Sequence, residues 1–181
     1  VSVTVLNAKP VQQICKGMEL VIKDSIDHGF ITQKEILSLL NNKKLSPIGK
    51  EIAGINTRQL EDELSLHPLV DNVECFHTPG GRIAIEITQR LPILRVMASN
   101  GDNYYIDEKG RIMPLPNNAA NVAVVTGMVD RNFAIKELYE FGLFLQHHPL
   151  WKAQIQQINV TPAKELELVP RVGEHIIFLG K

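Results

Sequence analysis

The sequence has few of the features that mark membrane-spanning, secreted or nucleic-acid-binding chains. No uninterrupted apolar run approaches the roughly 18 residues of a transmembrane helix, and no basic-then-apolar leader opens the chain. The 19 basic and 20 acidic side chains give a net charge of −1, whereas nucleic-acid binders normally carry a basic excess. Because the chain begins at Val1 rather than Met, we expect that an upstream segment has been removed. A missing anchor therefore does not argue for a cytoplasmic protein.

Cysteine is scarce as well. The two present, Cys15 and Cys75, cannot build a disulfide framework, and neither lies in a redox motif. Cys75 occupies an alternating apolar run, which predicts a buried structural thiol because a free cysteine behaves as a small hydrophobe. The pattern around Cys15 does not place it, so a disulfide between the two cysteines remains open.

What remains is the composition of an ordinary globular protein. Hydrophobic residues make up 44% and charged residues 22%, which excludes a disordered or fibrous chain. A length of 181 residues, at roughly 100–200 residues per domain, allows one large domain or two small ones. The chain starts with alternating Val residues and loses the alternation at residues 7–10, so we treat residues 1–16 as a lead-in segment.

Residues 17–91 predict a small sheet covered by two helices. Apolar side chains alternate along residues 18–23, which indicates a short half-buried strand. Two helix starts follow, each with a capping residue and a Glu or Gln three positions later: Thr32 with Glu35, and Asn56 with Gln59. An apolar residue before each cap can pack against one inside the helix, Ile31 on Ile36 and Ile55 on Leu60.

The spacing of apolar residues in each of these helices predicts a single apolar stripe. The stripe of the first helix is expected to hold Ile36, Leu37, Leu39 and Leu40. In the second helix Leu60 and Leu64 are expected to face the core, while the acidic residues between them face water: Glu61, Asp62 and Glu63. These acids also suit the positive end of the helix dipole, and Pro68 ends the helix.

A hairpin completes this part of the chain. Val73 and Cys75 alternate with Glu74 and Phe76, a turn at Gly80-Gly81 follows, and three isoleucines alternate along residues 82–88. The order strand, helix, helix, strand, strand predicts an α+β layer pair, with both helices on one face of the sheet.

Residues 92–181 predict a second unit of a different kind. Strand patterns over residues 93–98, 103–106, 112–113 and 122–126 are separated by turn signals. Residues 132–147 predict a helix, with Ile135, Leu138, Phe141 and Leu145 on one face. Three further alternating segments end the chain, at residues 158–160, 166–168 and 176–178. We therefore expect a meandering, mostly antiparallel β domain with one crossing helix.

Motifs for catalysis, phosphate binding and metal binding are absent: the chain has no G-x-S-x-G, H-E-x-x-H, P-loop or G-x-G-x-x-G. His147 and His148 point about 100° apart on a helix, so we interpret them as structural residues of its last turn. His67 and His77 are expected to be exposed at strand ends. We predict no catalytic, metal or cofactor residues, and the remote alternative is a small hydrolase with a cryptic site.

We also interpret an aspartate, two neighbouring tyrosines and the single tryptophan as structural residues. Asp107 precedes a turn at Gly110 and is expected to cap it through backbone amides. Tyr104 and Tyr105 point to opposite faces of a strand, so one is expected in the core and the other at the surface. Trp151 is expected to be an anchor in the core or at its rim.

The order of these elements, followed by residues 92–96 (PILRV) and 104–115 (YYIDEKGRIMPL), resembles the extracytoplasmic part of the FtsQ family of bacterial cell-division proteins, in its Bacteroides-like version. Residues 89–92 are similar to the family's domain junction, and Asp107 with Gly110 matches its recurrent turn. Residues 168–173 resemble the usual lead to a late strand. The resemblance implies a POTRA-like domain over residues 17–91 and an FtsQ-type β domain over residues 92–181.

The resemblance also implies a function: a non-catalytic divisome scaffold of septum formation that recruits FtsB-like and FtsL-like proteins. It implies an inner-membrane protein with a single span and with this chain on the periplasmic side. It implies no nucleic-acid or small-molecule partner, no cofactor, and membrane contact only through an N-terminal anchor. Family members begin with a cytoplasmic piece and that span, and they continue past Leu179 into a further helix and strand. We therefore expect this chain to be trimmed at both ends or to be a shortened relative.

Strand addition is the expected mode of partner binding, because edge strands of small sheets carry unpaired amides and carbonyls. The predicted partner-binding residues lie on two candidate edges: Val73, Glu74, Cys75 and Phe76 in the first unit, and Ile176, Ile177, Phe178 and Leu179 in the second. For each edge the alternative is that it is covered internally. The alternative function is a POTRA-bearing, chaperone-like module of outer-membrane protein assembly or secretion. A single POTRA unit before a non-barrel β domain argues against it.

Overall fold

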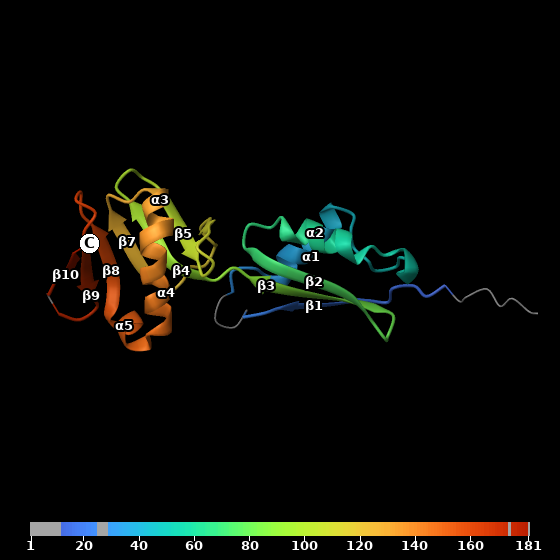
Figure 1. The fold of residues 1–181 in the computed structure, drawn as a ribbon. Helices are drawn as coiled ribbons and strands as arrows, with labels where there is room; N and C mark the ends of the chain where they lie inside the picture. The colour runs from blue at the N-terminus through green and yellow to red at the C-terminus, as the bar shows by residue number, and fades with distance from the viewer. Residues whose placement is uncertain (1–11, 25–28, 174, 181) are drawn as a thin grey trace, which may run out of the picture. The chain divides into compact units, whose positions relative to one another are not determined.

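A computed structural model of the chain describes residues 12–24, 29–173 and 175–180, which form two compact units (Figure 1). Unit 1 contains residues 12–23 and 31–88. Unit 2 contains the described residues from Gln89 onward, together with residues 24, 29 and 30. Residues 1–11 of the expected lead-in lie outside the described residues. Within its remainder, Ile14 forms an isolated β-bridge with Glu51.

Unit 1 is a three-stranded sheet with two helices on one face (Figure 1). Its elements are β1 (Met18–Ile22), α1 (Gln33–Asn42), a 3₁₀ turn (Ile52–Gly54), α2 (Thr57–Ser65), β2 (Val70–Thr78) and β3 (Arg82–Gln89). β3 lies in the centre, parallel to β1, with Met18 opposite Ile83, and β2 pairs with its other side. The predicted α+β order of strand, helix, helix, strand, strand is confirmed.

Both helices of unit 1 begin where the sequence places their caps. The Thr32 hydroxyl accepts a hydrogen bond from the Glu35 N–H at 3.2 Å, and the Asn56 side-chain oxygen accepts one from the Gln59 N–H at 3.1 Å. Each bond satisfies one of the amides that the first turn of a helix leaves without an intrahelical partner. These starts are local features, so the sequence alone was enough to predict them.

The buried stripe of α1 is narrower than expected. Ile36 and Leu40 are buried, whereas Leu37 is 40% exposed and Leu39 is half-buried. Ile36 and Leu40 lie about one turn apart on the same face, and Leu37 is rotated about 100° from Ile36. The predicted four-residue stripe was therefore wrong for Leu37, because a short helix contacts a small sheet along a single line.

Unit 2 is built on a seven-stranded sheet. From edge to edge its strands are β10 (Ile177–Gly180), β9 (Leu166–Pro170), β8 (Ile155–Val160), β7 (Ala123–Gly127), β4 (Pro92–Ala98), β5 (Asn103–Asp107) and β6 (Ile112–Met113). The outer pairs are antiparallel, as predicted, but β7 runs parallel to both β4 and β8. The expected meander breaks at the centre because parallel neighbours need a crossover, and the helical segment between β7 and β8 provides one.

That helical segment crosses one face of the sheet (Figure 1). It consists of α3 (Arg131–Phe133), a π turn (Ala134–Leu138) and α4 (Tyr139–His147), and α5 (Pro149–Gln154) follows. In the π turn the Tyr139 N–H bonds to the Ala134 carbonyl, five residues back. The wider spacing puts Ala134 and Leu138 on the buried face and turns Ile135 out to solvent. Ile135 was therefore wrongly predicted, whereas Leu138 and Leu145 are buried as expected.

A glycine lets α4 approach the sheet closely. A Cβ atom on Gly142 would come within 2.8 Å of the Leu94 side chain, which is nearer than real Cβ atoms come. Leu94 itself is fully buried in the core between the helix and the sheet. A larger residue at position 142 would require the Leu94 side chain or α4 itself to shift.

Both tyrosines of β5 are buried, which corrects the prediction that one lies at the surface. Tyr104 belongs to the main core cluster of unit 2. Tyr105 points to the opposite face, and its hydroxyl accepts a hydrogen bond from the Ala120 N–H at 3.3 Å. The segment between β6 and β7 therefore covers that face locally, which strand alternation alone does not reveal.

Candidate functional site

β10 forms one edge of the unit 2 sheet. Its only strand neighbour among the described residues is β9, where Ile177 lies opposite Leu168 and Phe178 opposite Glu167. The alternation near the end of the chain predicted this strand correctly, and the strand begins directly after Ile176. Ile176, Ile177, Phe178 and Leu179 are all exposed, Phe178 to 69%. β10 therefore combines apolar side chains on its two faces with an outer edge that pairs with no other described strand, and its pairing with β9 shifts register between Phe178 and Gly180.

β2 forms an edge of the unit 1 sheet, but a side chain from α2 covers part of it. The Cys75 N–H donates a hydrogen bond to the Glu61 carboxylate at 2.8 Å. Glu61 was predicted to face water, and it turns toward β2 instead. The sequence holds no signal for this contact, because the two residues meet only when α2 packs on β2. Phe76 is exposed on the face opposite Cys75, as the alternation predicted.

The Cys75 thiol is buried and stays protonated at neutral pH. Burial, together with a smaller effect of the nearby Glu61 carboxylate, raises its pKa to about 12. Cys15 is buried too, and its thiol donates a hydrogen bond to the Gly17 carbonyl at 3.2 Å. Both cysteines are free, which answers the open question of a disulfide and confirms the predicted structural thiol at position 75.

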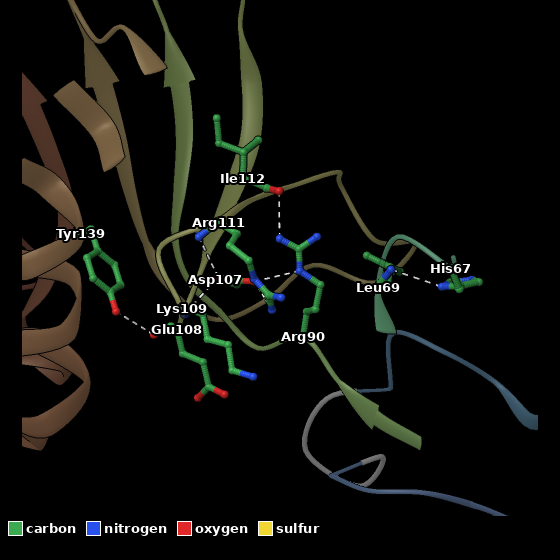
Figure 2. A network of polar contacts seen from close by, with 9 residues as sticks. All are labelled: His67, Leu69, Arg90, Asp107, Glu108, Lys109, Arg111, Ile112 and Tyr139. Carbon is green, nitrogen blue, oxygen red and sulfur yellow. Dashed lines mark hydrogen bonds and ion pairs between the residues drawn. The ribbon is translucent and has the colours of Figure 1, made fainter. Parts of the chain in front are cut away.

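His67 is more buried than predicted. Its side chain is 10% exposed, and Figure 2 shows it beside Leu69, whose backbone N–H donates to His67 Nδ1 at 3.2 Å. With Nδ1 accepting, Nε2 holds the proton and donates to the Glu35 carboxylate at 3.1 Å. The predicted exposed strand-end histidine was wrong because this bond joins α1 to the chain that follows α2. His77 is exposed as predicted.

His148 closes the end of α4. Its Nδ1 lies 2.7 Å from the Phe144 carbonyl oxygen, and its ring stacks on the Phe144 ring with centroids 4.1 Å apart. His147 beside it is exposed. Across the described ranges 12–24, 29–173 and 175–180, no three His, Cys, Asp or Glu side chains are grouped so as to hold a metal ion.

Asp107 caps the turn after β5, as predicted, and does more than that (Figure 2). Its Oδ1 accepts hydrogen bonds from the Lys109 N–H at 3.0 Å and the Arg111 N–H at 2.8 Å. Its Oδ2 accepts one from Arg90 Nε at 2.8 Å and one from Arg111 Nε at 2.9 Å. Arg90 also donates to the Ile112 carbonyl at 2.8 Å, so it joins the first residues of unit 2 to the strands of the sheet.

This network keeps the Asp107 carboxylate ionised although it is fully buried. Burial by itself raises the pKa of Asp107, and the hydrogen bonds from the Arg111 backbone and from the side chains of Arg90 and Arg111 outweigh it, so the pKa lies below its usual value. All of these groups are engaged with one another, so the network suits a structural role rather than proton transfer. Sequence reasoning missed Arg90, whose only signal was its place in the junction at residues 89–92.

An apolar depression, which we call the α4–β10 hollow, lies beside the β10 edge. It has a volume of about 310 Å³ and is lined by residues of α4, α5, β9 and β10: Phe141, Phe144, Leu145, Trp151, Leu168 and Leu179. Trp151, predicted as an anchor, lies at the rim and is 40% exposed. The sequence did not predict this hollow, because its walls come from four elements that only the folded chain brings together.

These features define a class of protein: a POTRA-type unit followed by a β domain with an exposed edge strand. Comparison with family models agrees. A model of the POTRA-like domain matches residues 13–88, and one described as FtsQ/DivIB, C-terminal related, matches residues 91–181. The chain belongs to the FtsQ/DivIB family, a family of membrane-anchored, non-catalytic scaffolds of cell division.

A search of curated proteins found no match to the chain. Within the described part of the chain, no helix has the length and apolar character needed to cross a bilayer.

Proposed function

We propose that this chain is the extracytoplasmic part of a single-pass inner-membrane division protein and that it recruits FtsB-like and FtsL-like proteins by strand addition on the periplasmic side. Family membership supports the scaffold role. The observation that carries the binding mode is the β10 edge, which pairs with no described strand on its outer side and whose apolar side chains are exposed. A partner strand pairs its backbone with such an edge, and its alternate side chains then meet neighbours such as Phe178 and Leu179.

Of the two candidate edges, we propose β10 as the principal docking site, through Ile176, Ile177, Phe178 and Leu179. The second candidate, Val73, Glu74, Cys75 and Phe76 of β2, ranks lower because the Glu61 carboxylate already accepts the outward Cys75 amide at 2.8 Å. A partner strand at β2 would have to displace that carboxylate before it could form a continuous ladder.

The domain division that we propose is a lead-in over residues 1–16, a POTRA-like domain over 17–91 and a β domain over 92–181. The match of residues 91–181 to the FtsQ/DivIB model argues against the alternative of a chaperone-like module of outer-membrane assembly or secretion. The membrane anchor of the proposed protein lies upstream of these residues.

Two proline variants test the edge. Neighbouring amides in a strand point to opposite sides, so one of Ile177 and Phe178 directs its N–H to β9 and the other directs it outward. Proline removes that amide in Ile177→Pro or Phe178→Pro. We expect the variant that loses the outward amide to keep its Tm and to bind an FtsB-like extracytoplasmic fragment about tenfold more weakly. The other variant is expected to lose stability.

The measurement is a pull-down with the FtsB-like fragment beside a thermal melt of each variant. The unmutated chain and Leu115→Pro, a change in the exposed segment after β6, serve as controls. If both β10 variants fold and bind as the unmutated chain does, β10 is not the docking site.

A further inference from the structure

Unit 1 has two exposed isoleucines at the end where the chain enters it. Ile14 is 47% exposed and Ile48 is 54% exposed, whereas the three isoleucines of β3 are fully buried. Backbone hydrogen bonds hold the two segments together: the Gly49 N–H donates to the Cys15 carbonyl at 3.0 Å, and the Cys15 N–H donates to the Lys50 carbonyl at 2.8 Å. Ile14 and Ile48 therefore lie on neighbouring segments of one small surface.

Three exposed lysines lie within four residues of these isoleucines: Lys16, Lys44 and Lys50. Lys50 Nζ donates to the Lys44 carbonyl at 3.2 Å, and within the described part of the chain none of the three ammonium groups is paired with a carboxylate. One exposed acid, Glu51, lies opposite Ile14. Basic charge is thus in local excess, although the whole chain has a net charge of −1. We call Ile14, Lys16, Lys44, Ile48 and Lys50 the entry surface.

The entry surface lies at one end of unit 1, away from the end of β3. β1 and β3 are parallel, with Met18 opposite Ile83, so both strands begin at the same end of the sheet (Figure 1). The Lys16 N–H donates to the Gly81 carbonyl at 3.1 Å, which places the entry surface beside the turn before β3. β3 then runs for 8 residues, about 26 Å, and ends at Gln89. The described chain therefore enters unit 1 at the entry surface and leaves it at the far end.

The direction of the chain and the charge of the surface together indicate what the surface meets. The FtsQ/DivIB family is membrane-anchored, and the proposed function places the anchor upstream, so the chain reaches unit 1 from the membrane side. Anionic lipid headgroups attract clustered lysines, and apolar side chains among those lysines enter the interfacial layer of a bilayer. A protein partner suits this surface less well, because lysine is depleted in the buried part of protein interfaces.

We propose that the entry surface docks unit 1 on an anionic lipid bilayer, with Ile14 and Ile48 in the headgroup region and the three lysines against lipid phosphates. The inference rests on the proposed function for the side on which the anchor lies. It adds a second membrane contact to the anchor, which the family resemblance implied as the only one. Because the anchor holds the surface at a high local concentration, a weak affinity is sufficient. The contact restricts the orientations of unit 1 on the membrane.

Flotation of the whole chain with lipid vesicles measures this contact without any partner protein. The two probes are vesicles of phosphatidylcholine alone and vesicles in which about a third of the lipid is phosphatidylglycerol. We expect about half of the chain to float with the anionic vesicles at millimolar lipid and low salt, and almost none with the neutral ones. Raising the ionic strength should release most of the bound chain, because salt screens exposed charges.

Matched variants separate the entry surface from the rest of the chain. Ile48→Glu is expected to weaken binding to anionic vesicles about tenfold or more, whereas Leu66→Glu should change it less than about twofold. Leu66 is 74% exposed and follows α2, at the opposite end of unit 1. Lys44→Glu is expected to weaken binding about tenfold, and Lys136→Glu, the same charge change on unit 2, less than about twofold. Circular dichroism melts establish which variants are folded, and Lys44→Glu keeps the test valid if Ile48→Glu unfolds.

A fluorescent label reports which residue meets the lipid. Because Cys15 and Cys75 are buried, a maleimide dye reacts selectively with a new thiol in Ile48→Cys or in Leu66→Cys. With an environment-sensitive dye, anionic vesicles should shift the emission of the label at position 48 to shorter wavelength and leave the label at position 66 unchanged. A shift produced by inorganic phosphate alone would indicate a simple anion site and overturn the inference.

The other outcomes also decide. Absence of flotation with anionic vesicles, or full binding by both Ile48→Glu and Lys44→Glu, would refute the membrane contact. A shift that depends on the concentration of the chain alone, with a dimer in sedimentation that Ile48→Glu abolishes, would mean that a second copy covers the surface and would overturn the inference. Vesicle binding by a chain that does not bind the FtsB-like fragment would support the docking and refute the recruitment, whereas the reverse result would refute only the docking.

Discussion

At the β2 edge of unit 1 a backbone amide is bonded to the Glu61 carboxylate, whereas the β10 edge of unit 2 presents apolar side chains to solvent. Both strands lie at the end of their sheets. A carboxylate held against an edge opposes pairing with another chain, because a partner strand must first displace the charge. The difference supports our proposal that a partner strand adds at β10 rather than at Cys75.

Unit 2 also uses a buried carboxylate to satisfy backbone amides, but at a turn rather than at a strand edge. The Asp107 carboxylate accepts hydrogen bonds from two amides of the turn between β5 and β6 and binds two arginines. One carboxylate in each unit therefore satisfies backbone amides, whereas β10 has apolar side chains, and the following predictions test these contacts.

The largest effect is expected for Asp107→Ala. Removing the carboxylate leaves Arg90 without its buried partner and the turn without its cap, so the free energy of unfolding of unit 2 should fall by about 3 kcal/mol. Urea unfolding followed by Trp151 fluorescence reports on this unit. A loss below about 1 kcal/mol would mean that the network is not needed for stability.

The pH dependence of stability in acid should show the contribution of the same carboxylate. Because the folded-state pKa of Asp107 lies below its ordinary value, its stabilising contribution is present above about pH 4 and is lost as the pH falls through the folded-state pKa. In Asp107→Asn this part of the acid sensitivity should be missing, and that comparison is the control for the alanine variant.

The next largest effect on stability is expected at the β2 edge of unit 1. Glu61→Ala leaves the outward Cys75 amide without its acceptor, which should lower the free energy of unfolding of unit 1 by about 1–3 kcal/mol. It should also expose the β2 edge, so self-association at high concentration is expected to rise. Amide hydrogen exchange over residues 70–78 and sedimentation measure the two effects. Asp62→Ala, at an exposed neighbouring position, should show neither.

Smaller effects are expected at the helix starts of unit 1. Thr32→Ala and Asn56→Ala each remove a side-chain acceptor for a first-turn amide, which should cost about 1 kcal/mol. Urea melts followed by circular dichroism measure the loss. Thr32→Ser retains the hydroxyl and should recover most of it; equal stability of all these chains would place the caps elsewhere.

The smallest change in the free energy of unfolding at neutral pH is expected when the Cys75 thiol is removed. Its folded-state pKa of about 12 lies above the value of 9.0 for an ordinary thiol, so its contribution is fully present below pH 9 and is lost as the pH rises from 9 toward 12. Cys75→Ala should lack this alkaline decline. The free energies of unfolding of both chains at pH 8 and pH 10.5 check the sign. An identical decline in both would show that the thiol does not cause it.

The sequence was most informative where a structure depends on residues a few positions apart. Thr32 bonds to Glu35, Asn56 to Gln59, and Asp107 to Lys109 and Arg111, so all of these caps and turns lie within four residues. Alternation likewise predicted β10 and the buried face that holds Val73 and Cys75. For Leu37 and Ile135 periodicity failed, because the contact line of a short helix and the extra residue of a π turn depend on the surface below.

The sequence by itself therefore determined the order of elements, the helix starts, the cap at Asp107 and the apolar strand at β10. Only the tertiary structure decided that Glu61 binds the Cys75 amide, that Arg90 binds Asp107 and that Trp151 and Leu179 line the same hollow. The physical reason is the range of the interactions involved. Backbone hydrogen bonds and side-chain alternation act between near neighbours in the chain, whereas edges, buried ion pairs and hollows form where distant segments pack together.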